Sequence, residues 1–474
     1  MLLKLDTNTL TGLMILSLPM SIKLFFPSIN TEFIFPAEFL IGILVILFSY
    51  NLLFRRQKVD FFDKSFLMHP LTILVFLYLI INSLSTVFST MPLVSLKATI
   101  VKYCYIITFY FAVHTWIKLS FDSYLEMLKI YATSLAFVTI YALANHLQLG
   151  LNRNNAGFVS YPFFNDHTMY GAALAFLIPS LLSFSFFSKV FQFNYFQRVS
   201  FFLIMILFVL GFYFSFCRAA WISLFMGMIL LLLILAGLRF KGFIFLLGIL
   251  LVIMFFNRGG LINSFKENKI DSNVSNAGIY EQIFSLTNIS NDVSNLERLN
   301  RWSCATRMFF DKPWFGFGPG TYQFQYSNYQ RKEEMTYIST NPIRKNEKLS
   351  HSWSAVVGGL SSQPGFAIRT EGGGTAHSEY FLALSETGIF SILIFIAFFF
   401  VALYVALRGF TKSQNKKIKI MIMVALLGLT TYFVHGLFNN FLDDSSLAFL
   451  FWSSLSVLTT IDASFFHQSG KDFK

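Results

Sequence analysis

Long apolar stretches recur along the whole chain, and they constrain its fold more than any other feature of the sequence. A stretch of about 17 to 25 mostly apolar residues is long enough to cross a bilayer as a helix. Such stretches lie near residues 9–26, 33–53, 70–89, 99–117, 126–147, 167–187, 199–216, 219–237, 241–257, 379–407, 418–438 and 445–462. The sequence therefore predicts an all-α integral membrane protein with about twelve transmembrane helices.

The composition agrees with a membrane protein. Only 13% of the 474 residues are charged and 55% are hydrophobic, whereas a soluble domain carries about 25% charged residues. The net charge of +12 is explained by the Lys and Arg that accumulate in the cytoplasmic loops of membrane proteins. We therefore expect a lipid bilayer, and no nucleic acid, among the partners of the chain.

Basic residues fall on alternate short connections, and this pattern predicts the orientation in the membrane. The connections "FRRQKVDFFDK", "SKVFQFNYFQR", "GLRFKG" and "RGFTKSQNKKIK" are rich in Lys and Arg, whereas the short connections of the other side share one Arg. The side rich in Lys and Arg is the cytoplasmic one. Both termini are therefore expected in the cytoplasm. The first apolar stretch is expected to be a span, because no cleavage site follows it.

One connection is long. Residues 258–378 form a polar loop on the outer side, between spans nine and ten. The loop separates residues 1–257, with spans one to nine, from residues 379–474, with spans ten to twelve and a cytoplasmic tail. Its first part is rich in Asn and Ser and is expected to be irregular. The stretch "LERLNRWSCATRMFFDK" then predicts an amphipathic helix that stops at Pro313, before a Gly/Pro turn. The loop is therefore expected to form a small lid on the outer mouth.

Three arginines are candidates for anion binding. Arg218, in "FSFCRAAWISL", lies between two apolar runs on the outer side. It is either functional or a side chain that snorkels to the interface, and neither reading is favoured. Arg298 and Arg301 are three residues apart and share one helix face. A solvated face is the reading that periodicity favours, but arginine also suits a bidentate grip on phosphate.

His377 directly precedes the tenth apolar stretch. Its unperturbed pKa lies near working pH, so it could act as a general base. A polar residue at the interface is the more common outcome for a lone histidine. If the segment is helical from Ala376, then His377, Phe381, Leu384 and Gly388 share a face. Glu379 and Glu386 would then point away from His377.

Other polar residues collect at the same outer level. Five of these residues lie at the outer ends of spans six and eleven: Asp166, His167, His435, Asp443 and Asp444. We expect them to be helix caps or walls of one outer cavity. Lys97 and Lys102 lie near the outer start of span four and could help to attract an anion. The sequence contains no cluster of His and carboxylates at metal-ligand spacing, so we expect no metal and no cofactor. Cys217 and Cys304 could both lie outside and pair, although this is the less common outcome.

Several of these stretches together resemble the O-antigen ligase and O-antigen polymerase superfamily of bacterial membrane glycosyltransferases. "AHSEYFLALSETGIFSILIF" is similar to a loop-ending His followed by an apolar helix with Glu-x-Gly. "SFCRAAWISL" is similar to a Ser-Arg-Gly-Ala block, with Cys217 and Ala219 replacing Ser and Gly. "ERLNRWSCATRMFFDKPWFGFGPGTY" is similar to Arg-x3-Trp followed by Pro-x2-Gly-x-Gly, which aligns Arg298. "LSTVFSTMPLVSLKATIVKY" and "FNDHTMYGAALAFLIPSL" also match in character.

The resemblance implies a GT-C-like, multi-span glycosyltransferase in the bacterial inner membrane. Its donor would be a glycan on undecaprenyl diphosphate, transferred on the periplasmic side without a metal and with inversion. Carried over by position, Arg218 and Arg298 would hold the diphosphate, and His377 would activate the acceptor hydroxyl. Arg301, Lys97, Lys102, Asp166, His167 and His435 are expected to line the substrate site.

Three functions remain open at this stage. The first is a ligase that joins the glycan to lipid A–core, which the His-Ser-Glu and Arg-x3-Trp blocks slightly favour. The second is a polymerase of repeat units, or a related enzyme that glycosylates protein hydroxyls. The third is a transporter of lipid-linked glycans, which would need matched halves and ionisable groups near the bilayer midplane. The long loop and the outer position of the polar residues disfavour this third function.

Overall fold

The computed structural model describes residues 7–26, 31–54, 62–237, 239–256, 293–331, 334 and 374–469. The Asn/Ser-rich part of the long loop, which was expected to be irregular, lies outside these residues. The α-helices are α1 Thr7–Ser17, α2 Ala37–Phe54, α3 Lys64–Leu67, α4 Pro70–Val87, α5 Pro92–Ile106, α6 Val113–Leu119, α7 Asp122–Leu149, α8 Arg153–Ala156, α9 His167–Phe186, α10 Tyr195–Phe214, α11 Arg218–Leu235, α12 Phe240–Phe256, α15 Val293–Asp311, α16 Tyr322–Gln325, α19 Glu379–Thr387, α20 Ile389–Lys412, α21 Lys416–His435 and α22 Ser445–Ser469. The remaining elements are the 3-10 helices η1 Leu18–Met20 and η3 Tyr326–Tyr329, the π-helix η2 Ile107–Ala112, and the strands β1 Ile22–Phe26 and β2 Thr31–Phe35.

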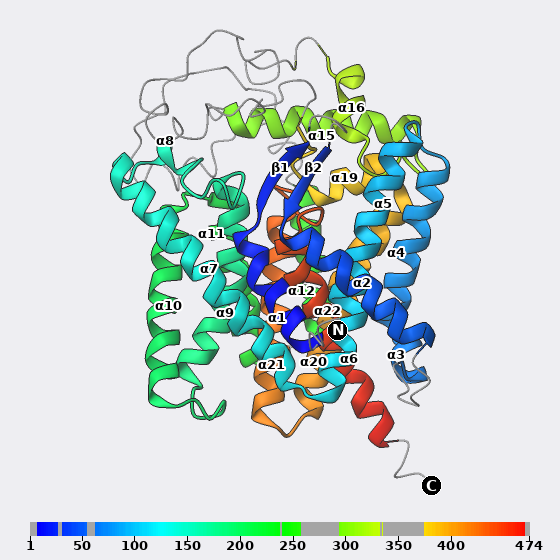
Figure 1. The fold of residues 1–474 in the computed structure, drawn as a ribbon. Helices are drawn as coiled ribbons and strands as arrows, with labels where there is room; N and C mark the ends of the chain where they lie inside the picture. Colours follow the sequence, from blue (N-terminus) through cyan, green and yellow to red (C-terminus); the bar gives the residue numbers. More distant parts are fainter. Residues whose placement is uncertain are drawn as a thin grey trace.

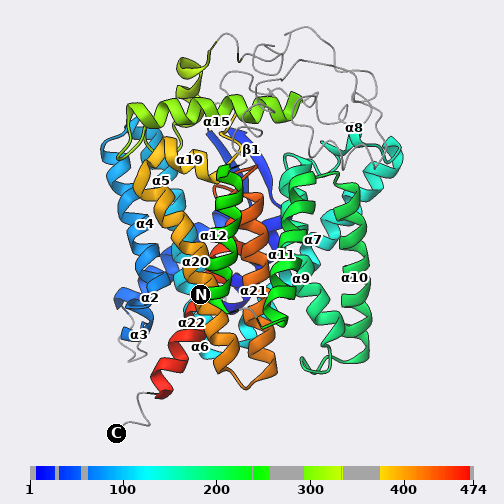
Figure 2. The ribbon, with the colours of Figure 1, turned by 180° about the vertical axis from the view of Figure 1, so that it is seen from behind.

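Apolar helices of membrane-spanning length dominate the fold, and the chain is a helical, multi-pass membrane protein (Figures 1 and 2). Ten helices of the described residues are long and apolar enough to cross a bilayer. α5, η2 and α6 count among them as one continuous helix, Pro92–Leu119. Two of the twelve predicted spans are not among these ten: α12, which has 17 residues, and the first span, whose apolar helix ends at Met20.

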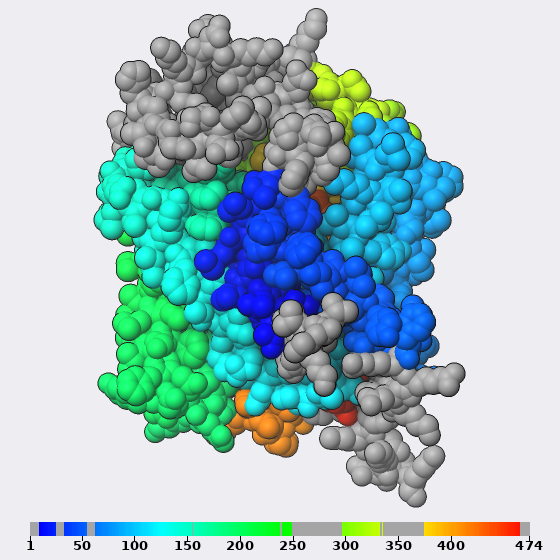
Figure 3. All heavy atoms as spheres, viewed as in Figure 1, coloured from blue at the N-terminus to red at the C-terminus, as the bar shows by residue number. Residues whose placement is uncertain are grey.

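The structure differs from the sequence prediction at the first two spans, where two paired strands interrupt them. β1 and β2 pair antiparallel, with Ile22 opposite Phe35 and Lys23 opposite Ile34. Aromatic and β-branched residues alternate with Lys23 and Glu32 here, and this composition favours strands. Short apolar runs of this kind are ambiguous between helix and strand. The space-filling view shows the N-terminal residues in the middle of one face (Figure 3).

α22 is the central helix of the bundle. All of its apolar window, Ser445–Ser464, is buried inside the protein. Its small polar side chains bind neighbouring helices: Ser456 Oγ donates to the Tyr110 carbonyl at 2.8 Å, and Ser454 Oγ lies 2.9 Å from Tyr124 OH. Within a membrane bundle, such residues allow close approach and supply hydrogen bonds between helices.

α15 lies across one end of the bundle, and α19 lies beneath it (Figure 1). The link between α20 and α21, residues 413–415, and the C-terminal end of α22 lie at the opposite end (Figures 1 and 2). The predicted amphipathic helix is confirmed as α15, which ends at Asp311, two residues before Pro313. Its position gives the bundle one polar end, and the candidate residues gather there.

Candidate active site

The segment 374–378 carries His377 and is irregular. His377 has φ +49°, and α19 begins only at Glu379. The expectation that the segment is helical from Ala376 is therefore wrong, and so is the shared face inferred from it. The cause is a set of local contacts: the His377 N–H donates to Thr375 Oγ1 at 3.4 Å, and Trp302 Nε1 donates to the His377 carbonyl at 3.4 Å.

Arg301 holds this segment from α15. Its Nη1 donates to the Thr375 carbonyl at 2.9 Å, and its Nε donates to Glu297 Oε1 at 2.9 Å. The guanidinium also lies 5.1 Å from the centre of the Tyr326 ring. Arg301 is 6% exposed, so the reading of a solvated charged face is wrong for this residue. The N–H donors of Arg301 bind Thr375 and Glu297, so this residue stabilises the segment before His377, in addition to its predicted contact with substrate.

Burial and positive neighbours keep the imidazole of His377 neutral. The pKa of His377 is lowered to about 4, first by burial and then by the guanidinium groups of Arg301 and Arg298. The Asp166 carboxylate and the Asn439 amide oppose this shift. At neutral pH the ring therefore carries a lone pair that can accept a proton.

Asp166 and His167 form the start of α9. Asp166 Oδ1 accepts from the Thr168 N–H at 2.7 Å and from the Met169 N–H at 3.0 Å, which is an N-cap. Burial would raise the pKa of Asp166, but the Thr168 hydroxyl, the charge on His167 and these N–H groups lower it. The predicted cap is confirmed, and the carboxylate stays ionised.

Arg218 is the first residue of α11, and the start of α11 packs closely against α9. Gly171 makes this possible, because a Cβ there would lie 2.8 Å from Cys217 Cβ and 3.4 Å from Ala220 Cβ. Arg218 and Arg298 both interact electrostatically with His167. Helices α9, α11 and α15 thus bring these charges to one level.

His435 completes the cluster from the end of α21. It is 1% exposed and interacts electrostatically with Arg298, Asp166 and His167. Its Nε2 lies 3.0 Å from Asn439 Nδ2. Of the residues singled out in the sequence, the structure therefore brings together six, which we call the outer cluster: Asp166, His167, Arg218, Arg298, His377 and His435.

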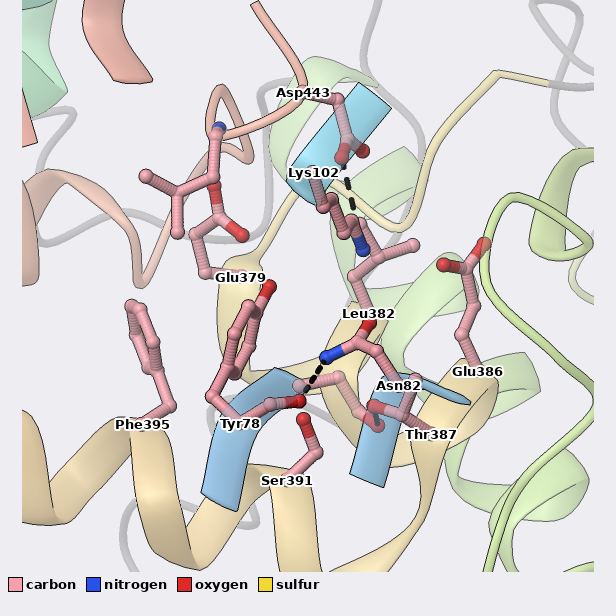
Figure 4. Close-up of a pocket in the computed structure, with 12 residues that line it drawn as sticks. Tyr78, Asn82, Lys102, Glu379, Leu382, Glu386, Thr387, Ser391, Phe395 and Asp443 are labelled. Carbon is pink, nitrogen blue, oxygen red and sulfur yellow. Dashed lines mark hydrogen bonds and ion pairs between the residues drawn. The ribbon is translucent and has the colours of Figure 1, made fainter. Parts of the chain in front are cut away.

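Lys102 lies in a different polar surrounding. It lines a small pocket with Glu379, Glu386 and Asp443 (Figure 4), and its Nζ lies 3.7 Å from Asp443 Oδ1. Lys97 is exposed on the same helix and interacts with Glu38. Three carboxylates around Lys102 offset its charge, so the predicted attraction of an anion stays a prediction.

Glu386 holds the glycine-rich turn, which sequence reasoning missed. Its Oε2 accepts from the Gly320 N–H at 2.9 Å, and its Oε1 accepts from the Tyr322 N–H at 3.0 Å. The Phe317 and Gly318 N–H groups donate to the carbonyls of residues 385 and 386. The Glu-x-Gly and Pro-x2-Gly-x-Gly blocks are therefore parts of one interlocked structure.

Glu379 was also missed, because the helical-face argument pointed it away from His377. Its Oε1 accepts from Tyr432 OH and from the Phe441 N–H at 2.6 Å each, and from the Leu442 N–H at 2.9 Å. It thereby joins α19 to the turn between α21 and α22. No simple periodic signal marks such a contact, since the partners are more than 50 residues apart.

The three cysteines are free, so Cys217 and Cys304 do not form a disulfide in the structure. Among the described residues, no group of three or more His, Cys, Asp or Glu could hold a metal ion. Metal independence stays a prediction of the sequence.

In a comparison with known protein families, one family model matches part of the chain. The model of the family described as O-antigen ligase matches residues 203–340, which include Arg218, Arg298 and Arg301 and stop before His377. A search of curated proteins finds no match. The matched segment runs from α10 to the residues beyond η3, and so contains both helices that supply the arginines of the outer cluster. Through residues 203–340, the chain is therefore similar to the O-antigen ligase family.

Proposed function

We propose that the chain transfers a glycan from undecaprenyl diphosphate to an acceptor hydroxyl at the periplasmic face of the bacterial inner membrane. Lipid A–core is the proposed acceptor, which makes the chain an O-antigen ligase. The observation that carries the proposal is the outer cluster, where the neutral, partly buried His377 interacts with Arg298, and Arg298 and Arg218 both interact with His167. The match of residues 203–340 to the O-antigen ligase family model supports glycosyl transfer in polysaccharide assembly.

The proposed reaction is a single displacement. The acceptor oxygen bonds to the anomeric carbon on the face opposite the diphosphate, and the bond from that carbon to the diphosphate oxygen breaks. The diphosphate leaves with the electron pair, and the anomeric configuration inverts. The acceptor proton moves to the lone pair of His377, so the charge is balanced within the site.

Arg218 and Arg298 would stabilise the leaving group. A lipid diphosphate gains negative charge as it departs, and guanidinium groups fixed nearby stabilise that charge without a metal. Arg218 is also the first residue of α11, and a helix N-terminus adds a partial positive charge at that place. His377 would supply the general base, which contributes about 10²- to 10⁴-fold in rate.

Reconstitution in vesicles tests the proposal. The wild type, His377→Ala and Arg218→Ala would each receive an undecaprenyl diphosphate oligosaccharide with lipid A–core, with repeat units alone, or with EDTA. Transfer to lipid A–core that survives EDTA and is lost in both variants is the expected result. A ladder of repeat units without lipid A product would identify a polymerase. Passage of donor across the bilayer without transfer to any acceptor would contradict the enzyme and favour a transporter.

A further inference from the structure

The turn between α21 and α22, residues 436–444, packs directly against the segment that carries His377. The Glu379 N–H donates to the Gly436 carbonyl at 2.9 Å, and Ser378 Oγ donates to the same carbonyl at 3.2 Å. The two residues that follow His377 are therefore bonded to the first residue of this turn. The position of the imidazole depends on the turn.

The far end of the same turn is held by one carboxylate. Glu379 Oε1 accepts from the N–H groups of Phe441 and Leu442 and from Tyr432 OH. Glu379 is 7% exposed, and Figure 4 shows it among the residues that line the pocket of Lys102. An ionised carboxylate that accepts several N–H and O–H groups forms strong hydrogen bonds. The turn is thus fixed at both ends by α19 and the residue before it.

Asn439 lies in the middle of this turn, between two histidines. It is 3% exposed, and its Nδ2 lies 3.0 Å from His435 Nε2. An amide NH₂ can only donate, so His435 Nε2 is the acceptor. Asn439 Oδ1 is then the end of the amide that is left to accept from His377, with whose ring the Asn439 side chain forms a hydrogen bond that favours the imidazolium. The contact with His435 therefore orients the Asn439 amide so that its oxygen is the atom available to His377.

We infer that Asn439 is a positioning residue for His377. Its Oδ1 accepts one ring N–H of His377, which leaves the lone pair on the other ring nitrogen to face the acceptor hydroxyl. When the acceptor proton arrives on that nitrogen, the same N–H···Oδ1 bond stabilises the imidazolium, and no proton passes to the amide. The inference rests on the proposed function for the role of His377, and it gives His435 a task behind Asn439 instead of a contact with substrate.

The surroundings of His377 explain why a neutral partner is useful. Arg298 and Arg301, on α15, disfavour the protonation of His377, whereas Asp166, at the start of α9, favours it. Glu379 is two residues away, but its Oε1 is occupied by the turn. Asn439 supports the imidazolium without adding a negative charge next to a diphosphate, as the Asn of a Cys-His-Asn triad orients its imidazole.

Two variants of Asn439 and one control test the inference. Asn439→Asp keeps the size and adds a negative charge, so the pKa of His377 should rise above about 4. Asn439→Ala removes the acceptor and should lower both this pKa and kcat, the latter by about ten- to a hundredfold, which is less than the loss of a whole general base. Asn440→Asp is the matched control, because the Asn440 Oδ1 has no hydrogen-bond partner among the described residues.

Two measurements separate this inference from the proposed function. The pH dependence of kcat/KM follows His377 during transfer, and ¹⁵N NMR of labelled histidine follows its titration without donor, with His377→Gln used for assignment. An upward shift in Asn439→Asp that is absent from Asn440→Asp supports the positioning role. Equal titration in both variants, or a rise in Asn439→Ala, would overturn it. An NMR shift without transfer by the wild type would overturn the proposed function alone.

Discussion

At the scale of single residues, two arginines of one helix face divide the work. Arg301 binds the Thr375 carbonyl and Glu297, so its donors maintain the segment before His377. Arg298 interacts with His377, as Arg301 does, but also with His167 and His435, across the outer cluster. Periodicity predicted that they share a face. It could not assign their tasks, because these depend on Thr375, His377 and His435, more than 70 positions further along the chain, and on His167, more than 100 positions earlier.

Arg301→Lys tests this division. Lysine keeps the positive charge but has one nitrogen, so it cannot contact Thr375 and Glu297 together in the geometry of the guanidinium. We expect kcat to fall about tenfold with little change in the KM for donor, because the base is displaced by a small distance. Transfer kinetics check this result, with Arg331→Lys at an exposed position as the control. A raised donor KM with unchanged kcat would instead place Arg301 on the substrate.

The pH profile provides a second test at this scale. Protonation of His377 removes the lone pair, so kcat/KM should be level near neutral pH and fall tenfold per pH unit below about 4, the lowered pKa. An unperturbed histidine would place this decline near pH 6.5. Measurement of kcat/KM between pH 3.5 and 8 distinguishes the two cases. A decline centred near pH 6.5 would contradict the burial of His377 beside Arg298 and Arg301.

At the scale of elements, the break between α19 and α20 is built by glycines. Gly388 has φ +79° and ψ −168°, and a Cβ there would lie 2.2 Å from the Trp314 carbonyl oxygen. A Cβ at Gly316 would lie 2.4 Å from the Glu386 carbonyl oxygen. The backbone of the Pro-x2-Gly-x-Gly block is thus in direct contact with the backbone of the Glu-x-Gly block, which is why both blocks contain glycine. The sequence predicted the turn, but it joined α19 and α20 into one span because hydropathy does not reveal a single left-handed residue.

Gly388→Ala should therefore destabilise the protein. The backbone region of Gly388 is almost restricted to glycine, and a non-glycine residue there costs about 1–3 kcal/mol in strain, to which the overlap with Trp314 adds. Thermal unfolding in detergent, followed by circular dichroism, measures the loss. Gly42→Ala in α2 is the control, because a Cβ there meets no atom within 4 Å. An unchanged unfolding temperature for Gly388→Ala would show that α19 and the glycine-rich turn are not interlocked.

At the scale of the whole molecule, the bundle has two chemically different ends. Hydropathy and charge predicted a multi-pass helical protein with its candidate residues at one end, and the fold bears this out. The paired strands β1 and β2 and the short first helix could not be predicted, since a window average does not distinguish an apolar strand from an apolar helix. The members of the outer cluster could be predicted from residue type alone. The contacts of Asn439 and Glu379 could not, because they depend on the path of the turn 436–444.

The orientation of these two ends can be tested directly. Lys412, Lys416, Lys417 and Lys419 flank the link between α20 and α21, at the end opposite α15 (Figure 1), and the positive-inside rule places them in the cytoplasm. In a variant without the native cysteines, Ser327→Cys near α15 and Gln414→Cys in the link are both at exposed positions. A membrane-impermeant maleimide applied to intact cells with a permeable outer membrane should label Ser327→Cys and spare Gln414→Cys, whereas lysed cells should show both. The reverse pattern in intact cells would place the outer cluster in the cytoplasm, where a periplasmic acceptor could not reach His377.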